Sequence, residues 1–491
     1  MRIALSLALV TLQSLSTDYE RAIERARAGE LEESRAILIA LRDANPSDKR
    51  PHIELAGIAF RQSLYGDAKR HISSALRIDP YDAYATDFLA TLYLLEDNIE
   101  AALKYWNRLG EPRIDRVRID PPFEIDPVLW DRAFAFSPSS VLTLEDFRDT
   151  RARLDSLELL AGGRFDLVPS GADMDLEFHP VPLGGRIGSN RWSTIGAVAR
   201  GLPYETVQLD FMNIASKGIN ASTLARWDSA KRRAEARVAI PLGKEPGRRF
   251  EVTVDGRDES WVLPAEEFRL RRLKGSARIE SQINHRWTWV FGLNFSDRNS
   301  GKRGDRNGFL MTYETGITHR LLTVPERRLY ADVGLSTEFG KRYFKGTGQM
   351  GVRWVPGTAD NYEATGHFRF GGVWGDAPFD ELFVLGLDRD HELLLRGHPG
   401  SGKGRKGQGP LGRAFMLWNL DLLRNVFREP FFSVRAGPFV DLARVTGERR
   451  FFVDGGIRME VALVNGLRLD FSLGADLYSG RTATFYRSRW E

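Results

Sequence analysis

The chain contains no cysteine among its 491 residues, so it can form neither a disulfide bond nor a lipid anchor on a cysteine thiol. It also lacks any internal apolar run of about 18 or more residues, which excludes membrane-spanning helices. Basic residues number 70 and acidic residues 66, and the two signs are interleaved along the chain. Because no face or helix concentrates the basic residues, we do not expect nucleic-acid binding.

Signatures of catalysis are equally scarce. The 8 histidines are scattered, and none has a metal-ligand spacing such as H-E-x-x-H. There is no G-x-S-x-G nucleophile elbow. The segment Gly400 to Gly409 is rich in Gly and Lys but lacks the Walker order and the preceding parallel strand, so we interpret it as a mobile loop tip. We expect no enzyme, no cofactor and no metal site.

The first residues have the order of an export signal. Arg2 precedes an apolar run over residues 3–12, and Ser14 and Ser16 follow at the spacing that signal peptidase reads. We therefore expect residues 1–16 to be a secretory signal peptide. A buried first helix is the alternative.

Residues 17–112 show helical periodicity that repeats. Asn45-Pro46 and Asp79-Pro80 are separated by the ~34-residue tetratricopeptide period. Small and large apolar residues fall on the packing positions of that motif: Leu55, Ala56, Ala68, Ile72 and Ala75 in one unit, and Leu89, Ala90, Tyr93, Ala102 and Trp106 in the next. The segment resembles tetratricopeptide repeats, which implies a groove for a partner; a structural spacer is the alternative.

Residues 113–182 form a short mixed segment. The pattern predicts a strand over 128–136, a helix over 144–159, and strands over 164–168 and 174–180. Leu144, Phe147, Leu154 and Leu157 make the buried stripe of the helix. The segment resembles a polypeptide-transport-associated (POTRA) domain, which implies exposed strand edges that accept an extended client. A plain linker domain is the alternative.

Residues 183–491 are dominated by stretches in which apolar and polar residues alternate. Between Gly466 and Leu477, for example, Leu469, Phe471 and Leu473 lie on one face of a strand, while Asp470 and Ser472 lie on the other. Such a pattern, repeated in about sixteen segments, is typical of an antiparallel transmembrane β-barrel with a lipid-facing exterior and a charged lumen.

The strand candidates are centred near Ile195, Leu209, Ala236, Thr253, Phe268, Ile279, Trp289, Tyr313, Val333, Gln349, Phe368, Trp418, Arg435, Ile457, Phe471 and Tyr486. Aromatic residues suited to the membrane interfaces are Trp192, Trp289, Trp418, Tyr486 and Trp490. The fold class is therefore multidomain: helical repeats, a small α+β domain and a barrel of about sixteen strands.

A long interruption separates the strand candidates at Phe368 and Trp418, and long loops in compact proteins are usually functional or disordered. Phe383 to Gly386, followed by Leu395-Arg396-Gly397-His398, is similar to the F-x-x-G-G and V/I-R-G-F/Y signature of the BamA/TamA-type outer-membrane assembly superfamily, also called bacterial surface antigen proteins. The element lies before the fifth strand from the end, as it does in that family.

The resemblance implies that the loop folds into the lumen and that Arg396 pairs with an acidic residue of the wall, for which Asp441 is the candidate. The alternation over residues 433–441 agrees, because it places Arg435 and Asp441 on the inner face. Asn419 and Asp421 match the inward polar positions of the preceding strand, and Gly397 permits the tight turn. The chain departs from the signature at His398, where an aromatic residue is usual, and at Leu387, where a second glycine is usual.

These features together predict a bacterial outer-membrane protein with its N-terminal domains in the periplasm. The barrel would assist the insertion or translocation of polypeptides, and the soluble domains would recruit clients or a periplasmic partner. The alternatives are a secretion or transport pore for a single substrate and, from a different class, an outer-membrane barrel enzyme.

Overall fold

The computed structural model describes residues 17–183, 205–305, 307–356, 361–388, 392–463 and 467–490, together with 198, 201 and 202. The expected signal peptide, the strand centred on Ile195 and the side chains of Trp192 and Trp490 lie outside what is described. The chain divides into two compact units. One unit extends to Asp115 and includes Ser139–Leu144 and Ser170–Met174, and the other contains the rest.

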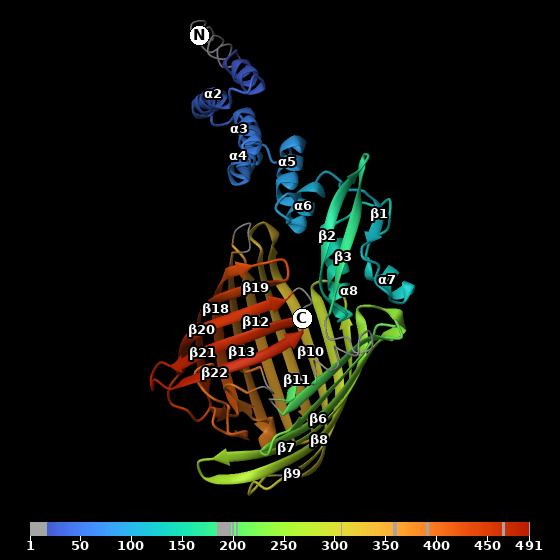
Figure 1. Cartoon of the computed structure of the whole chain (residues 1–491), viewed down its shortest axis with the longest axis vertical. Coiled ribbons are helices and arrows are strands. Elements are labelled where there is room, and N and C mark those ends of the chain that lie inside the picture. The colour runs from blue at the N-terminus through green and yellow to red at the C-terminus, as the bar shows by residue number, and fades with distance from the viewer. Residues whose placement is uncertain are drawn as a thin grey trace. The chain divides into compact units, whose positions relative to one another are not determined.

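The first unit is helical (Figure 1). A helix over 17–27 is followed by α2 (Leu31–Ala44), α3 (Arg50–Arg61), α4 (Tyr65–Ile78), α5 (Ala83–Leu94) and α6 (Ile99–Trp106). Residues expected at packing positions, among them Leu55, Ala68, Leu89 and Ala102, are buried between the helices. In the part of the chain described, no helix is both long and apolar enough to cross a membrane.

The helix ends fall where the Asn-Pro and Asp-Pro pairs predict them. Asn45 caps the C-terminus of α2, and Asp79 caps that of α4. The two junctions are linked by Lys49, whose Nζ lies 2.6 Å from Asp79 Oδ2 and 2.5 Å from Asp82 Oδ2. The hydrogen bond from Lys49 lowers the pKa of the Asp79 carboxyl.

A small α/β region follows, made of β1 (Ile114–Ile119), α7 (Pro127–Ala133), α8 (Leu144–Ser156), β2 (Leu160–Ser170) and β3 (Asp173–Pro182). Its sheet has three strands in the order β1-β3-β2. The predicted helix and the two strands after it are present. Phe147, Leu154 and Leu157 of the predicted stripe are buried.

The strand predicted over 128–136 is wrong, because this segment begins with α7. The Asp126 side chain accepts a hydrogen bond from the Val128 amide at 2.9 Å, and Pro127 occupies the first helical turn, where its missing N–H costs nothing. Leu129 and Ala133 are the buried residues of this helix, one turn apart. The cap and the proline therefore outweigh the aromatic residues that suggested a strand.

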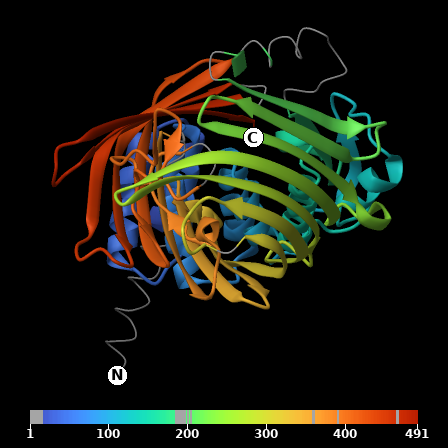
Figure 2. The ribbon, with the colours of Figure 1, turned by 90° about the horizontal axis from the view of Figure 1, so that it is seen from below.

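The rest of the second unit is a large antiparallel sheet of seventeen strands that curves into a barrel (Figures 1 and 2). Its long wall strands are β4 (Thr206–Ile214), β5 (Ile219–Trp227), β6 (Lys231–Pro241), β7 (Arg248–Leu263), β8 (Glu266–Gln282), β9 (Trp287–Ser300), β10 (Gly308–Val324), β11 (Leu329–Gly340), β12 (Tyr343–Trp354), β13 (Tyr362–Gly375), β18 (Ala414–Arg428), β19 (Phe432–Val445), β20 (Phe452–Leu463), β21 (Leu467–Asp476) and β22 (Thr482–Trp490). The two-residue strands β15 (Ser401–Gly402) and β16 (Arg405–Lys406) complete the set.

Each long strand pairs with the next along the chain, and β13 pairs with β18 across the intervening loop. The strands β22 and β4 follow one another in the strand order of the sheet. Among the residues described, however, no residue-by-residue register joins them, and the barrel is not closed by a continuous ladder at this point. We call the boundary between β22 and β4 the seam.

The predicted strand phases hold in the described wall. Leu420, Ile457 and Leu473 point outward, with exposures of 54%, 62% and 53%. Asp421 and Glu460, on the inner face of the same strands, are buried. At these positions the outer surface is apolar, and the charges lie inside.

Two strand predictions are wrong in detail. The candidates centred on Phe268 and Ile279 belong to the single strand β8, because Gly275 in its middle continues the antiparallel register opposite Val254. Strand β5 was not predicted, since its small and polar residues give only weak alternation of hydrophobicity. A barrel strand needs apolar side chains on only one face. Short residues can form that face, but they give little alternation of hydrophobicity in the sequence.

The α/β region is attached to the barrel at the turns between wall strands. Glu158, just after α8, lies 2.7 Å from Arg249 Nη1 on β7 and 3.1 Å from Arg237 Nη2 on β6. His285, in the turn between β8 and β9, lies 2.7 Å from Asp149 Oδ1. Asn220 of β5 donates to the Leu157 carbonyl at 2.9 Å. Contacts from several turns thus fix this region to one end of the barrel.

We expect Glu158→Gln to weaken this attachment by roughly 1 kcal/mol, because the carboxylate is partly exposed to solvent. Burial alone raises the pKa of Glu158, but the hydrogen bond from Arg249 and the charges of Arg237 and Arg249 lower it overall. A carboxyl whose pKa is lowered by folding stabilises the folded state at pH values above its unfolded pKa of about 4.3. This stabilisation is lost as the pH falls through the folded-state pKa. The protection factors of the α8 amides, which are corrected for the intrinsic pH dependence of exchange, should therefore fall in acid in the unaltered protein.

In the Glu158→Gln variant the same protection factors should be lower at neutral pH and should lose that acid dependence. Glu177→Gln, which removes a carboxylate from β3 at 3.5 Å from Arg118, is the matched control and should leave the exchange of α8 unchanged. Equal acid dependence in the unaltered protein and Glu158→Gln would show that this carboxylate does not secure the region.

Candidate functional site in the barrel lumen

The described residues of the loop between β13 and β18 fold into the barrel. It contains the 3-10 turn Phe379–Glu381 and the strands β14 (Phe383–Val384), β15, β16 and β17 (Leu411–Gly412). Pairing of β14 with β17 joins the two ends of the loop. Lys406 of β16 pairs in parallel with Trp261 of the wall strand β7. The loop is therefore hydrogen-bonded to a distant part of the wall.

Arg396 is the centre of a buried polar cluster, with an exposure of 6%. Its Nη2 lies 2.6 Å from Asp441 Oδ1 on β19, its Nε lies 2.9 Å from Asp441 Oδ2, and its Nη1 lies 2.5 Å from Asp421 Oδ1 on β18. The guanidinium also stacks on the ring of Phe439 at 3.8 Å. A forked cation between two carboxylates and an aromatic face is strongly oriented. We call this arrangement the arginine clasp.

The neighbouring residues complete the clasp. The Arg396 amide donates to Asp441 Oδ2 at 2.9 Å, so this carboxylate holds both backbone and side chain. Asn419 Nδ2 donates to Asp441 Oδ1 at 2.8 Å and to the Leu394 carbonyl at 2.9 Å. Asp441 is completely buried. Because both of its carboxylate oxygens accept hydrogen bonds, these bonds offset the cost of removing its charge from water.

Gly397 lies where no side chain fits. A Cβ at this position would come within 2.6 Å of Asp454 Cγ and of backbone atoms of Ala475 and Asp476. Its amide donates to Asp454 Oδ2 on β20. The glycine is required by this close approach of the loop to the wall, and not by an unusual backbone angle, because no left-handed φ occurs there.

His398 follows with its ring between wall carboxylates. Nδ1 lies 3.0 Å from Asp454 Oδ1, and Nε2 lies 3.7 Å from Asp476 Oδ2 on β21. The ring also meets Phe452 edge-on, at 5.2 Å between centroids. His398 replaces the aromatic residue of the signature. It keeps an aromatic contact, with Phe452, and adds polar contacts with Asp454 and Asp476.

The first half of the motif is apolar. Phe383 packs on Phe415 of β18 at 4.6 Å, within a buried cluster that includes Leu385, Leu395 and Leu417. Gly386 has φ +130°, a conformation that L side chains rarely adopt. Leu387 occupies the position where the signature has a second glycine. Its amide donates to the His398 carbonyl at 2.8 Å, and its side chain is buried.

A second set of ion pairs in the lumen was missed by sequence reasoning. Asp380 lies 2.9 Å from Arg272 Nη1 and 2.8 Å from Arg298 Nε, while Lys345 lies 3.1 Å from Glu381. These basic residues lie at inward-facing positions of β8, β9 and β12. The alternation of residue types in the sequence indicates that they face the lumen. Their partners could not be chosen, because every inward position of the wall is a candidate.

The expectation of a mobile tip at Gly400 to Gly409 is wrong. This segment forms the β15–β16 hairpin, and Lys406 lies 3.0 Å from Glu259 of β7. Glycine is needed here for close approach: a Cβ on Gly409 would come within 1.9 Å of the Leu385 carbonyl oxygen. The glycines therefore serve packing of the loop within the barrel.

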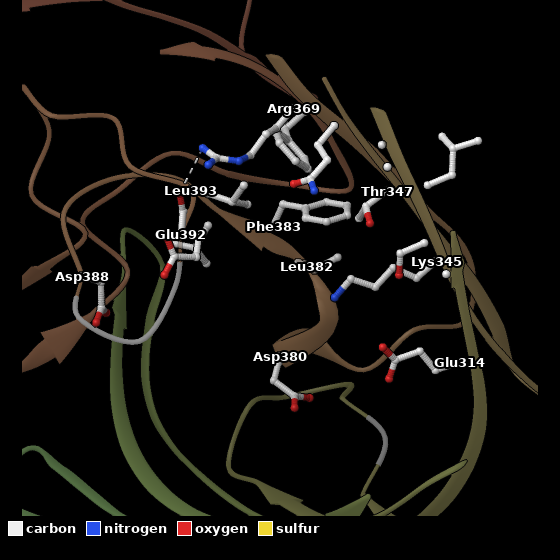
Figure 3. A pocket seen from close by; sticks show the side chains of 18 of the residues that line it. Glu314, Lys345, Thr347, Arg369, Asp380, Leu382, Phe383, Asp388, Glu392 and Leu393 are labelled. Carbon is white, nitrogen blue, oxygen red and sulfur yellow. Dashed lines mark hydrogen bonds between the residues drawn. The ribbon is translucent and has the colours of Figure 1, made fainter. Parts of the chain in front are cut away.

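Between the loop and the wall lies a cavity of about 560 Å³ (Figure 3). Charged and apolar residues both line it. Glu314, Lys345, Thr347, Arg369, Asp380 and Glu392 are among the labelled residues around it, and Phe383 and Leu393 contribute apolar surface. Both signs of charge face the space, and some of these charges pair, as Asp380 does with Arg272.

The fold and the site define a class of protein: an antiparallel barrel whose long internal loop is fastened to the wall by a buried arginine. No protein-family model matches the chain, and no curated protein matches it. Among solved structures, the chain is similar to CdiB from Escherichia coli, with a TM-score of 0.52, 13% identity, and coverage of 77% of this chain and 76% of that chain.

Further similar structures are CdiB from Acinetobacter baumannii, with a TM-score of 0.47, 12% identity and coverage of 77% and 73%, and BamA from Haemophilus ducreyi lacking POTRA domains 1-3, with a TM-score of 0.45, 12% identity and coverage of 77% and 85%. The likeness to the Escherichia coli protein supports the barrel fold. At such identities it defines fold and nothing more.

Proposed function

We propose that this chain is an outer-membrane barrel of the BamA/TamA-type superfamily that assists the insertion or translocation of other polypeptides, and that its helical and α/β regions face the periplasm. The observation that carries the proposal is the arginine clasp, in which Arg396 of the loop motif is held by Asp441 and Asp421 of the wall. It supports the family resemblance at the residues that define the motif.

A lipid environment follows from the outer surface. Large apolar side chains on several wall strands, such as Leu335, Leu420 and Ile457, are at least half exposed, at 52%, 54% and 62%. Burying this surface in hydrocarbon is favourable by roughly 25 cal/mol per Å². The backbone of the wall is paired strand to strand, as spanning a bilayer requires.

The seam supplies the mechanism. A client strand that enters the bilayer must satisfy its backbone hydrogen bonds, and lipid offers no partners. The edge of β22 opposite β21 presents backbone groups that can pair with such a strand. The client would then gain both backbone pairing and burial of its apolar face, so no nucleotide is needed.

The soluble regions would recruit the client. The sheet order β1-β3-β2 leaves β1 and β2 at the edges, and edge strands can accept an extended polypeptide by strand addition. This role fits the POTRA-like resemblance of residues 113–182. The helical region, similar to tetratricopeptide repeats, would bind a periplasmic partner through exposed aromatic residues such as Tyr81 and Tyr84.

A secretion pore for a single substrate is the second candidate. It is compatible with the same barrel fold, which the likeness to CdiB from Escherichia coli supports. Both functions use the same loop and lumen, and they differ in the number of proteins that depend on the barrel.

Depletion of the protein from its native cell, followed by quantitative analysis of the outer membrane, tests the proposal. We expect many barrel proteins to fall together while inner-membrane proteins stay constant. Loss of one exported protein, with the other barrels unchanged, would replace the proposed function with the secretion pore. No change in any exported or outer-membrane protein would contradict both.

A further inference from the structure

Acidic side chains form a row across the inner wall beside the arginine clasp. Asp441 on β19 lies directly opposite Asp454 on β20, and Asp454 lies directly opposite Asp476 on β21. Asp441 and Asp454 have no exposed surface, and Asp476 is 6% exposed. Like charges in directly opposed positions are destabilising unless cations balance them.

Within the described ranges, a permanent cation pairs with the acidic row only at its Asp441 end. Arg396 holds Asp441, but its guanidinium makes no contact with Asp454 or Asp476. In the described part of the chain, His398 is the only basic side chain within ion-pair distance of those two carboxylates. A neutral imidazole carries no charge, so this end of the row lacks a permanent cation.

Asp454 also has an unfilled acceptor. Its Oδ2 accepts the Gly397 amide and is in hydrogen-bond contact with His398 Nδ1 at 3.2 Å, whereas its Oδ1 is buried and has no hydrogen-bond partner. This oxygen lies 3.0 Å from His398 Nδ1, in a geometry that is not a hydrogen bond. A buried carboxylate oxygen without a hydrogen-bond partner is costly unless a cation or a proton donor meets it.

We propose that His398, Asp454 and Asp476 bind one divalent metal ion of the zinc type. Each residue offers one ligand atom, and these atoms lie within 4.8 Å of one another. Imidazole with two carboxylates suits Zn²⁺ and similar transition metals, whereas Ca²⁺ and Mg²⁺ prefer oxygen ligands alone. Water from the lumen completes the coordination sphere, because the His398 side chain is 17% exposed.

The ion would fasten the loop at a second point. Its ligands come from the loop motif and from the wall strands β20 and β21, next to the strands β18 and β19 that hold Arg396. The site explains a histidine at the position where the signature has an aromatic residue. It goes beyond the proposed function, and its test requires no client.

The experiment uses the full chain in detergent micelles, stripped of metal with a chelator and then dialysed against limiting Zn²⁺. We expect about one zinc per chain by elemental analysis of the unaltered protein. His398→Phe and Asp476→Asn should each weaken zinc binding by roughly tenfold or more. His319→Phe is the matched control and should retain the metal, since His319 stacks on Trp287 on the outer face, away from this cluster.

Trypsin provides the second readout, because Lys403 and Arg405 lie in the hairpin that follows the site. Zinc should slow cleavage there in the unaltered protein and in His319→Phe, but not in Asp476→Asn. Absence of bound zinc in the unaltered protein would overturn the site and leave an imidazole–carboxylate contact only. Undiminished zinc binding in both His398→Phe and Asp476→Asn, or protection that does not depend on zinc, would also overturn it.

Discussion

Replacing Arg396 with alanine should remove most of the folded, heat-modifiable form of the protein. The substitution leaves Asp421 and Asp441 buried in the lumen without their shared cation, and breaking a buried pair in this way costs about 3–5 kcal/mol. The loop would lose its anchor on β18 and β19. Gel mobility before and after heating, measured on membranes from cells that express the variant, reports the folded fraction.

Two variants define what the arginine contributes. Arg396→Lys keeps the charge but loses the fork that spans both carboxylates, so an intermediate folded fraction is expected. Arg353→Ala is the control for loss of an arginine, because Arg353 pairs with Glu363 at 3.0 Å but is 54% exposed. Its effect should stay below about 1 kcal/mol. Unchanged mobility of Arg396→Ala would mean that the clasp does not stabilise the barrel.

Gly397→Ala should displace the loop although it adds only a methyl group. The new Cβ would lie 2.6 Å from backbone atoms of Ala475 and Asp476, and a wall strand paired on both sides cannot move away. Overpacking of this kind costs typically 1–3 kcal/mol, and more where the neighbour is backbone. Faster cleavage of the loop by trypsin, together with a reduced heat-modifiable fraction, would report the displacement.

Gly275→Ala is the matched control for this substitution. Gly275 lies within the wall strand β8, and a Cβ there would meet nothing within 4 Å. The control should keep the folded fraction and the protease resistance of the unaltered chain. Equal behaviour of Gly397→Ala and Gly275→Ala would show that the loop does not approach β21 as closely as described.

Alternation of residue types made much of the barrel predictable. A residue on a strand faces lipid or lumen according to parity, so Leu420 and Asp421, or Val440 and Asp441, could be assigned to opposite faces from sequence alone. The same parity placed Arg435 inward, where the structure pairs it with Glu363 at 2.5 Å. Strand β5 was missed because Ala221, Thr223 and Ala225, the central residues of its outward face, are small.

Other features could not be read from local sequence. The strand predicted over 128–136 became α7, since a capping aspartate and a proline decided the conformation. Contacts between the loop and the far wall, such as Lys406 with Glu259, depend on how the loop crosses the lumen. The path of the loop depends on close packing at its glycines. Because these glycines follow no regular spacing in the sequence, the path cannot be predicted from it.

The loop motif was predicted more closely than the rest of the site. Arg396 lies against Asp441, as the resemblance implied, and Asn419 and Asp421 lie beside them. The resemblance gave no partner for His398, because that residue departs from the signature. Its carboxylate neighbours, Asp454 and Asp476, lie opposite each other on β20 and β21, in a register that local sequence does not specify.

Site-directed spin labelling tests the central claim most directly, and a chain without cysteine allows each label to be placed singly. Labels would replace the outward residues Leu420, Ile457 and Leu473, and the cavity-lining residues Thr347 and Gln349. In lipid vesicles, we predict that outward labels collide mainly with oxygen dissolved in the bilayer, and cavity labels mainly with a water-soluble nickel chelate. Outward labels shielded from both reagents would mean that this surface packs against protein, and the membrane-barrel account would be wrong.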